Sequence, residues 1–182
     1  MAATRTPRER WVEAGLTALA SGGPDAVRVE ALARSLGVTK GGFYWHFADR
    51  PALLEAVLDA WERHLVDEAI EHVESRPGDP RERLRRLLAL AASSDELRRV
   101  DLAVRIWARE DSAVATRLER ADERRVTYLR ELFAGICDDP ADVESRCLVV
   151  MSLFVAGPFL AVTHGRLTRA SVMGRIQDWL EA

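Results

Sequence analysis

The side chains with the clearest chemistry in this sequence lie close together, between Thr39 and His46. This stretch carries a hydroxyl, an ammonium group, a phenol, an indole and an imidazole beside two glycines. Lysine and histidine can donate hydrogen bonds to guanine acceptors, threonine can touch a thymine methyl group or a phosphate, and glycine lets a backbone approach closely. The stretch therefore suits contacts in the major groove of double-stranded DNA.

Three helices are expected to position this stretch. Apolar residues repeat at helical spacing over residues 8–21, and a Gly-Gly-Pro sequence ends this first helix. A second helix is expected over residues 29–36, with Gly37 as its left-handed C-terminal cap, and a third, capped by Thr39, reaches about Phe47. Two short helices joined by a tight turn must dock on the first through apolar side chains. The side chains expected to do so are those of Ala33, Leu36, Val38, Phe43 and Phe47.

The rest of the chain is also predicted to be helical. Asp49 can cap, and Pro51 can begin, a long fourth helix that reaches about residue 75. Five further helices are expected over residues 81–93, 95–109, 112–136, 140–163 and 168–181. Strand patterns are nearly absent. The fold class is therefore all-α with about nine helices, an N-terminal three-helix helix-turn-helix domain followed by a larger helical bundle.

The helix expected over residues 140–163 is apolar on nearly all its faces. Its uncharged run, residues 147–163, is too short for a membrane span and is interrupted by Gly157 and Pro158. We therefore expect a buried helix, kinked at Pro158 because proline lacks a backbone donor, and no membrane partner.

Charge and composition limit the possible functions. The chain has a net charge of −3, but residues 1–50 carry seven basic and five acidic side chains, so a small positive excess lies beside the candidate DNA contacts. An architectural protein that binds DNA without sequence preference should be much more basic. The first ten residues lack the apolar segment of a secretory signal peptide, and two cysteines are too few for a disulfide framework. A cytoplasmic location is expected.

The N-terminal domain resembles the TetR family of bacterial one-component regulators. The residues that carry the resemblance are Gly37-Val38-Thr39, Gly41-Gly42, Tyr44-Trp45-His46-Phe47 and Arg50, followed by a long capped helix. The resemblance implies base or phosphate contacts from a defined set of side chains. These are Arg28, Thr39, Lys40, Gly41, Tyr44, Trp45, His46 and Arg50. Tyr44→Ala or His46→Ala should then abolish discrimination among DNA sequences.

The resemblance also implies a division of the chain and a set of partners. Residues 1–50 would bind DNA, and residues 51–182 would bind an effector and form a homodimer through the helices near 140–163 and 168–181. The homodimer would bind a pseudo-palindromic DNA operator, and an unknown small-molecule effector would release it, so the chain would act as a ligand-responsive repressor. Segments 107–111 and 128–133 look like one variant of the family's C-terminal domain.

Aromatic and polar side chains beyond residue 60 could line the effector pocket, although for each one taken singly ordinary core is the simpler interpretation. The candidates are Trp61, His64, Trp107, Tyr128, Met151 and Phe154. No second histidine stands at metal-ligand spacing from His64, so we expect no metal, and no motif calls for a cofactor. Cys137 and Cys147 could form a redox switch, but ordinary packing is the simpler interpretation.

An alternative remains open from another class of protein. The chain could be an all-α enzyme or ligand carrier whose N-terminal bundle is only structural. The sequence offers no nucleophile elbow, no phosphate-binding loop and no metal-spaced His/Cys set, which disfavours an enzyme.

Overall fold

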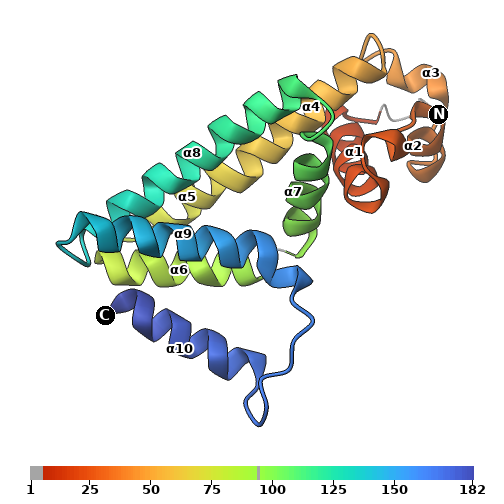
Figure 1. Ribbon diagram of the computed structural model, residues 1–182. Helices are drawn as coiled ribbons and strands as arrows, with labels where there is room; N and C mark the ends of the chain where they lie inside the picture. The colour runs from red at the N-terminus through yellow and green to blue at the C-terminus, as the bar shows by residue number, and fades with distance from the viewer. Residues whose placement is uncertain (1–5, 94) are drawn as a thin grey trace. The chain divides into compact units, whose positions relative to one another are not determined.

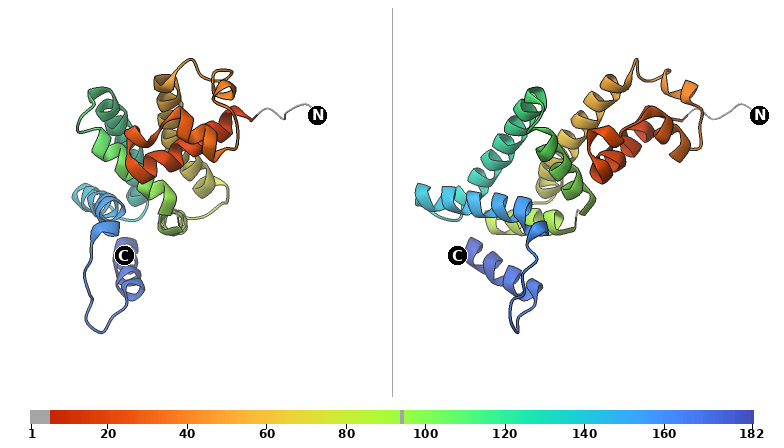
Figure 2. Two further views of the ribbon diagram at one scale, coloured as in Figure 1. Left: turned by 90° about the vertical axis from the view of Figure 1, so that its right-hand side faces the viewer. Right: turned by 45° about the vertical axis from the view of Figure 1, so that its right-hand side comes forward.

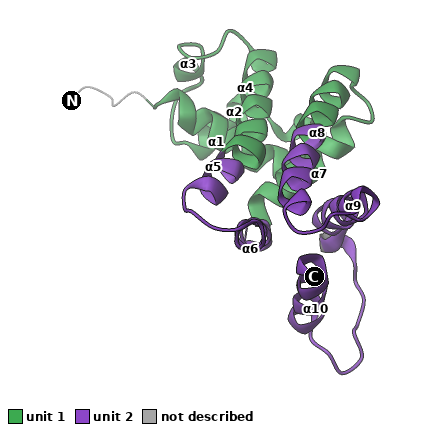
Figure 3. Ribbon diagram, turned by 90° about the vertical axis from the view of Figure 1, so that its left-hand side faces the viewer, with its two compact units in different colours: residues 1–67, 95–121 green, residues 68–94, 122–182 purple. Residues whose placement is uncertain are grey.

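The computed structural model describes residues 6–93 and 95–182. Within these residues the chain is made of helices and loops, and one isolated β-bridge joins His164 to Leu167. The chain forms two compact units, Met1–Asp67 with Asp95–Ala121, and Glu68–Ser94 with Asp122–Ala182 (Figure 3). The predicted all-α class is confirmed.

The first unit contains the helix-turn-helix. Its helices are α1 (Arg8–Gly22), the 3-10 turn η1 (Pro24–Ala26), α2 (Val29–Ser35), α3 (Lys40–Phe43), α4 (Arg50–Glu62), the π-helical turn η2 (Arg63–Asp67), α7 (Asp95–Trp107) and the first part of α8 (Ser112–Ala134). Helix α1 packs against α4 and α7, and α2 and α3 lie together near the start of α4 (Figure 1). The largest side chains buried at these contacts are those of Trp11, Leu19, Phe43, Leu53, Leu58 and Trp61.

A glycine sets how closely α1 and α4 approach. A Cβ atom added to Gly15 would lie 2.5 Å from Cγ2 of Val57, far inside van der Waals contact. Val57 is fully buried, so its side chain has no room to turn away. Gly15 is therefore required by the packing of these two helices, although glycine is a poor helix former.

Gly15→Ala should lower the free energy of unfolding of the first unit by about 1 to 2 kcal/mol, because overpacking outweighs the better helix propensity of alanine. Urea denaturation followed by circular dichroism measures this change. Val57→Ala removes the methyl group that clashes, so Gly15→Ala introduced into that variant should cost almost nothing. An equal cost in both backgrounds would contradict the packing argument.

The second unit is built around its own apolar core. Its helices are α5 (Glu68–Glu74), α6 (Pro80–Ser93), the second part of α8, α9 (Pro140–Ala156), the 3-10 turn η3 (Gly157–Phe159) and α10 (Arg169–Glu181). The core is formed by Val73, Leu84, Tyr128, Leu129, Leu132, Phe133, Val143, Cys147, Val150 and Leu180. Between α9 and α10 the chain leaves the helices of this unit as an extended loop (Figure 2).

Arginines hold the last turn of α10. Nη1 of the buried Arg146 donates to the carbonyl oxygen of Leu180 at 2.7 Å, and Nε of Arg81 donates to that of Glu181 at 2.7 Å. Arg85 forms an ion pair with the carboxylate of Glu181 at 2.5 Å. Positive groups are favourable at a helix C-terminus because carbonyl oxygens without partners collect there. These contacts fix α10 against α6 and α9.

Three helix boundaries differ from the sequence expectation. The helix expected to reach 163 ends at Ala156 and is not merely kinked, because Pro158 cannot donate a hydrogen bond and the chain tightens into η3. The helix expected to reach 75 changes to π-helical geometry at Arg63–Asp67 and becomes α-helical again in α5. Helix α3 is only one turn long and ends before Phe47.

Candidate nucleic-acid interface

The turn between α2 and α3 closes with a Schellman motif. Gly37 adopts a φ of 68°, a left-handed conformation that glycine tolerates best. The amide of Val38 donates to the carbonyl of Ala33 at 2.9 Å, and that of Gly37 donates to the carbonyl of Arg34 at 3.2 Å. Both bonds satisfy carbonyl groups at the end of α2. The predicted glycine cap is confirmed.

The N-terminal caps of the next two helices differ. The side chain of Asp49 accepts a hydrogen bond from the amide of Ala52 at 2.8 Å and caps α4, as predicted. The side chain of Thr39 makes no capping bond, so that prediction is wrong. The backbone carbonyl of Thr39 already accepts the amide of Gly42 at 3.0 Å, the donor that a threonine cap would take.

Four aromatic residues at and just after the end of α3 differ in burial. Phe43 and Phe47 are buried, and their rings stack at a centroid distance of 5.3 Å. Trp11 of α1 meets the ring of Phe43 edge to face at 5.5 Å. Tyr44 and Trp45 are instead 55% and 73% exposed. The core role predicted for the two phenylalanines is confirmed, and the two exposed aromatic side chains are available to a partner.

One of the three candidate DNA contacts at the start of α3 forms an ion pair. Thr39, Lys40 and Gly41 are all exposed at the start of α3. The ammonium group of Lys40 forms a hydrogen-bonded ion pair with Glu30 of α2. The hydrogen bond with Lys40 lowers the pKa of Glu30, and the same bond raises the pKa of Lys40, so both groups are charged near neutral pH. Sequence analysis did not single out Glu30.

Glu30→Gln should raise affinity for DNA about two- to fivefold at low salt, because it removes a negative charge and frees Lys40 for a phosphate. It should also make the logarithm of the association constant fall more steeply with the logarithm of the salt concentration. Fluorescence anisotropy in a salt series measures both effects. Glu9→Gln on α1 is a control of equal charge, and an equal gain from it would mean that only net charge matters.

Two arginines hold the turn that leads into α2. Nε of Arg28 donates to the carbonyl oxygen of Asp25 at 2.9 Å. Arg50, at the start of α4, donates from Nε to the carbonyl of Val27 at 2.8 Å and from Nη2 to that of Pro24 at 2.5 Å. A guanidinium has five N–H donors, so Arg50 retains donors for a phosphate. Both arginines therefore have a structural role that the sequence did not reveal.

Helix α4 is held at its far end by contacts within the first unit. Nε1 of the buried Trp61 donates to Oδ1 of Asp101 on α7 at 3.3 Å, and Asp101 is itself only 2% exposed. The guanidinium of Arg105 donates to the other oxygen of Asp101 at 2.8 Å. No sequence pattern indicates this pair, because forty positions separate Trp61 from Asp101.

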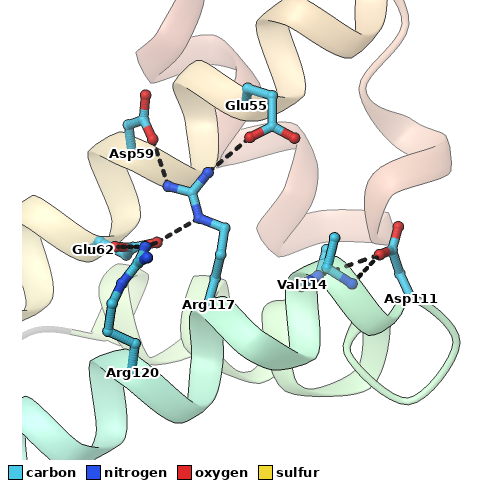
Figure 4. Close-up of polar contacts among 8 residues, drawn as sticks. Glu55, Asp59, Glu62, Asp111, Val114, Arg117 and Arg120 are labelled. Atoms are coloured by element: carbon cyan, nitrogen blue, oxygen red, sulfur yellow. Dashed lines mark hydrogen bonds and ion pairs between the residues drawn. The ribbon is translucent and has the colours of Figure 1, made fainter.

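Arg117 on α8 binds three carboxylates of α4 at once (Figure 4). Its guanidinium nitrogens lie 2.8 Å from Glu55, 2.5 Å from Asp59 and 2.5 Å from Glu62. The three acids share one helical face because their spacing is four and then three residues. One arginine therefore pairs with three like charges and joins the first part of α8 to α4.

The six candidate pocket residues are divided between the two units. Trp61, His64 and Trp107 lie in the first unit. Tyr128, Met151 and Phe154 lie in the second, where the hydroxyl of Tyr128 donates to Glu74 at 2.7 Å and the guanidinium of Arg125 lies 5.7 Å from the ring centroid of Phe154. A pocket formed by these residues stays a prediction.

Neither a metal-binding cluster nor a membrane-spanning helix occurs in the described part of the chain. No three His, Cys, Asp or Glu side chains there are arranged to hold a metal ion. None of the helices that the structure describes is long and apolar enough to cross a membrane. Cys137 and Cys147 are free thiols, and burial raises the pKa of Cys147 to about 11, so it is a weak nucleophile.

Comparisons with known proteins agree on the N-terminal region. Residues 12–57 match the family model described as bacterial regulatory proteins, tetR family. The transcriptional regulator AcrR of Shigella flexneri is 29% identical over 81 residues, which are 44% of this chain and 38% of AcrR. The uncharacterized regulator TtgW of Pseudomonas putida is 41% identical over 58 residues, 31% of this chain and 42% of TtgW. The chain thus spans less than half the length of both curated relatives.

The fold as a whole resembles solved regulators. A TetR-family transcriptional regulator from Agrobacterium tumefaciens superimposes with a TM-score of 0.72 at 14% identity, covering 96% of this chain and 97% of the other. The helix-turn-helix matches in sequence, and the described fold matches along nearly its whole length. Residues 12–57 are therefore similar in sequence to the TetR family of bacterial regulatory proteins, and the described fold is that of solved regulators of this family.

Proposed function

We propose that this protein is a ligand-responsive transcriptional repressor that binds a pseudo-palindromic operator as a homodimer in the cytoplasm. The observation that carries the proposal is the exposure of Tyr44 and Trp45 at the end of a helix-turn-helix of this family. Aromatic faces and polar tips can contact base edges and thymine methyl groups, while Arg28, Lys40 and Arg50 lie on surrounding positions suited to phosphates.

Exposed apolar side chains support a dimer formed by the second unit. Leu148 on α9 and Trp179 on α10 are 69% and 48% exposed, and Met173 on α10 is 39% exposed. A symmetric dimer would bury these side chains against their copies, as large exposed apolar patches are typical of interaction surfaces. Two-fold symmetry would then place the α3 helices of the two protomers in successive major grooves, about 34 to 36 Å apart or somewhat further.

The contacts of α4 support a route from effector to DNA. Arg50 joins the first turn of α4 to η1, whereas Trp61 joins α4 to α7 and the three carboxylates bound by Arg117 join it to α8. A shift of α7 or α8 would therefore be transmitted to the helix-turn-helix. An effector that binds only the shifted arrangement would draw molecules away from the DNA-bound state by its differential affinity.

The decisive experiment measures fluorescence anisotropy of labelled DNA from beside the gene, with a scrambled fragment of equal length as control. A preference for the native fragment that persists at about 150 mM salt is expected of a sequence-specific regulator. Equal, weak binding to both fragments would favour an architectural role. No binding at any salt concentration would favour the enzyme or carrier alternative.

Dimer formation has its own test. Leu148→Glu places a charge in the proposed interface and should shift sedimentation from dimer to monomer, with a parallel loss of operator affinity. Ile106→Glu changes another exposed apolar residue, 56% exposed on α7, and should leave the dimer intact. A dimer that survives Leu148→Glu would place the interface elsewhere.

A further inference from the structure

His46 differs from the two aromatic residues that precede it. Tyr44 and Trp45 are exposed, but the side chain of His46 is half-buried, and its Nε2 lies 2.8 Å from the carbonyl oxygen of Thr6. A carbonyl oxygen can only accept a hydrogen bond, so Nε2 carries the proton and donates it. The imidazole thus has a partner inside the protein, forty positions away in the sequence.

A second contact joins the same two segments. The guanidinium of Arg8, the first residue of α1, lies 4.9 Å from the ring centroid of Phe47. The amides of His46 and Phe47 both donate to the carbonyl of Phe43, at 2.9 and 3.1 Å, so both residues are fixed to the end of α3. The chain entering α1 and the chain leaving α3 are therefore held together by neighbouring contacts.

The hydrogen bond limits what His46 can offer to DNA. When a neutral imidazole donates through Nε2, its other nitrogen, Nδ1, has only a lone pair. Phosphate oxygens and the N7 and O6 atoms of guanine are also acceptors, so Nδ1 cannot bind them. Direct contact with these groups would require His46 to give up Thr6 or to take up a second proton.

We propose that His46 is a positioning residue, which locks the segment before α1 to the end of α3 and acts on DNA recognition through that lock. This inference rests on the proposed function, because it concerns how the DNA-reading residues are held. Tyr44 and Trp45 would then discriminate bases, whereas His46 would set their orientation relative to α1.

The test compares His46→Ala, His46→Gln and Tyr44→Ala on the operator and on a set of operators with single base-pair changes. His46→Ala should weaken binding about 2- to 10-fold, the effect of one hydrogen bond, and by the same factor on every operator. The amide of glutamine can donate from nearly the position of Nε2, so His46→Gln should restore affinity to within about twofold. Loss of discrimination at one base pair in His46→Ala would overturn the proposal.

A truncated chain that begins at Pro7 provides a second test, since it lacks the carbonyl of Thr6. His46→Ala should have almost no further effect on operator affinity in this background, because both changes break one contact. If the two losses multiply, His46 acts independently of Thr6, and the proposal is wrong.

A DNA-independent measurement separates this inference from the proposed function. Hydrogen exchange at the amides of residues 10–13, the first hydrogen-bonded amides of α1, should become faster in His46→Ala and stay unchanged in Tyr44→Ala, with far-ultraviolet circular dichroism confirming that both variants are folded. Unchanged exchange in His46→Ala would mean that His46 does not hold the segment before α1, and the proposal would be wrong. A wild-type protein that does not prefer operator to scrambled DNA would instead refute only the proposed function.

Discussion

Asp101→Ala is expected to lower the free energy of unfolding of the first unit by about 3 kcal/mol, toward the lower end of the loss when a buried ion pair is broken. Asp101 is 2% exposed and accepts hydrogen bonds from both Trp61 and Arg105. Removing its carboxylate leaves a buried indole N–H and a largely buried guanidinium without this acceptor. Urea denaturation followed by tryptophan fluorescence measures the loss directly.

Two controls isolate the buried carboxylate. Asp101→Asn keeps a side-chain oxygen for Trp61 and should cost less than the alanine variant. Asp95→Ala removes an acid from the same helix, but Asp95 is 81% exposed, so its loss should change stability by about 0.5 kcal/mol or less. A loss below about 1 kcal/mol in Asp101→Ala would mean that water replaces the carboxylate at little cost.

Local signals were enough to predict the helix-turn-helix. Gly37 and Asp49 each satisfy backbone groups that lie within five residues, so their roles follow from residue type and position. A short helix must dock on α1 through apolar side chains, which explains why Phe43 and Phe47 are buried while Tyr44 and Trp45 are exposed. These features could be read without knowing the rest of the fold.

Distant contacts could not be predicted in this way. Glu55, Asp59 and Glu62 look like an ordinary solvated face, and only the fold places Arg117 against them (Figure 4). The partner of His46 is a backbone carbonyl, which has no residue-type signal at all. Residue types therefore suggest which side chains contact DNA, which stays a prediction, but not which partners hold Arg28, Lys40, His46 and Arg50 within the protein.

The ends of helices could be predicted only in part, because they depend on distant contacts as well as on local residue types. Gly157 and Pro158 were visible as an interruption, but whether the helix bends or ends there depends on what packs after it. In the structure, the guanidinium of Arg169 binds the carbonyl of Gly157 at 2.7 Å, which stabilises the end of α9 and the base of the loop that follows. The π-helical turn at Arg63–Asp67 had no recognisable signal.

Tyr44→Ala should weaken operator binding by about 1 to 3 kcal/mol, or roughly 5- to 150-fold, if the exposed ring and hydroxyl contact a base. The loss should be small on scrambled DNA, because non-specific binding depends on phosphate contacts that this substitution leaves in place. Anisotropy titrations at one salt concentration give the loss of affinity for the operator and the loss for scrambled DNA. The ratio between them measures how much discrimination comes from this side chain.

Tyr44→Phe divides the effect between the ring and the hydroxyl. The ring of Tyr44 meets that of Phe43 edge to face at 5.2 Å, and phenylalanine can keep this contact. If Tyr44→Phe loses discrimination as fully as Tyr44→Ala, the hydroxyl forms the base contact; if it retains discrimination, the ring packs against a base or a thymine methyl group. Equal losses on operator and scrambled DNA in both variants would remove Tyr44 from base recognition and leave Trp45 as the exposed aromatic candidate on this surface.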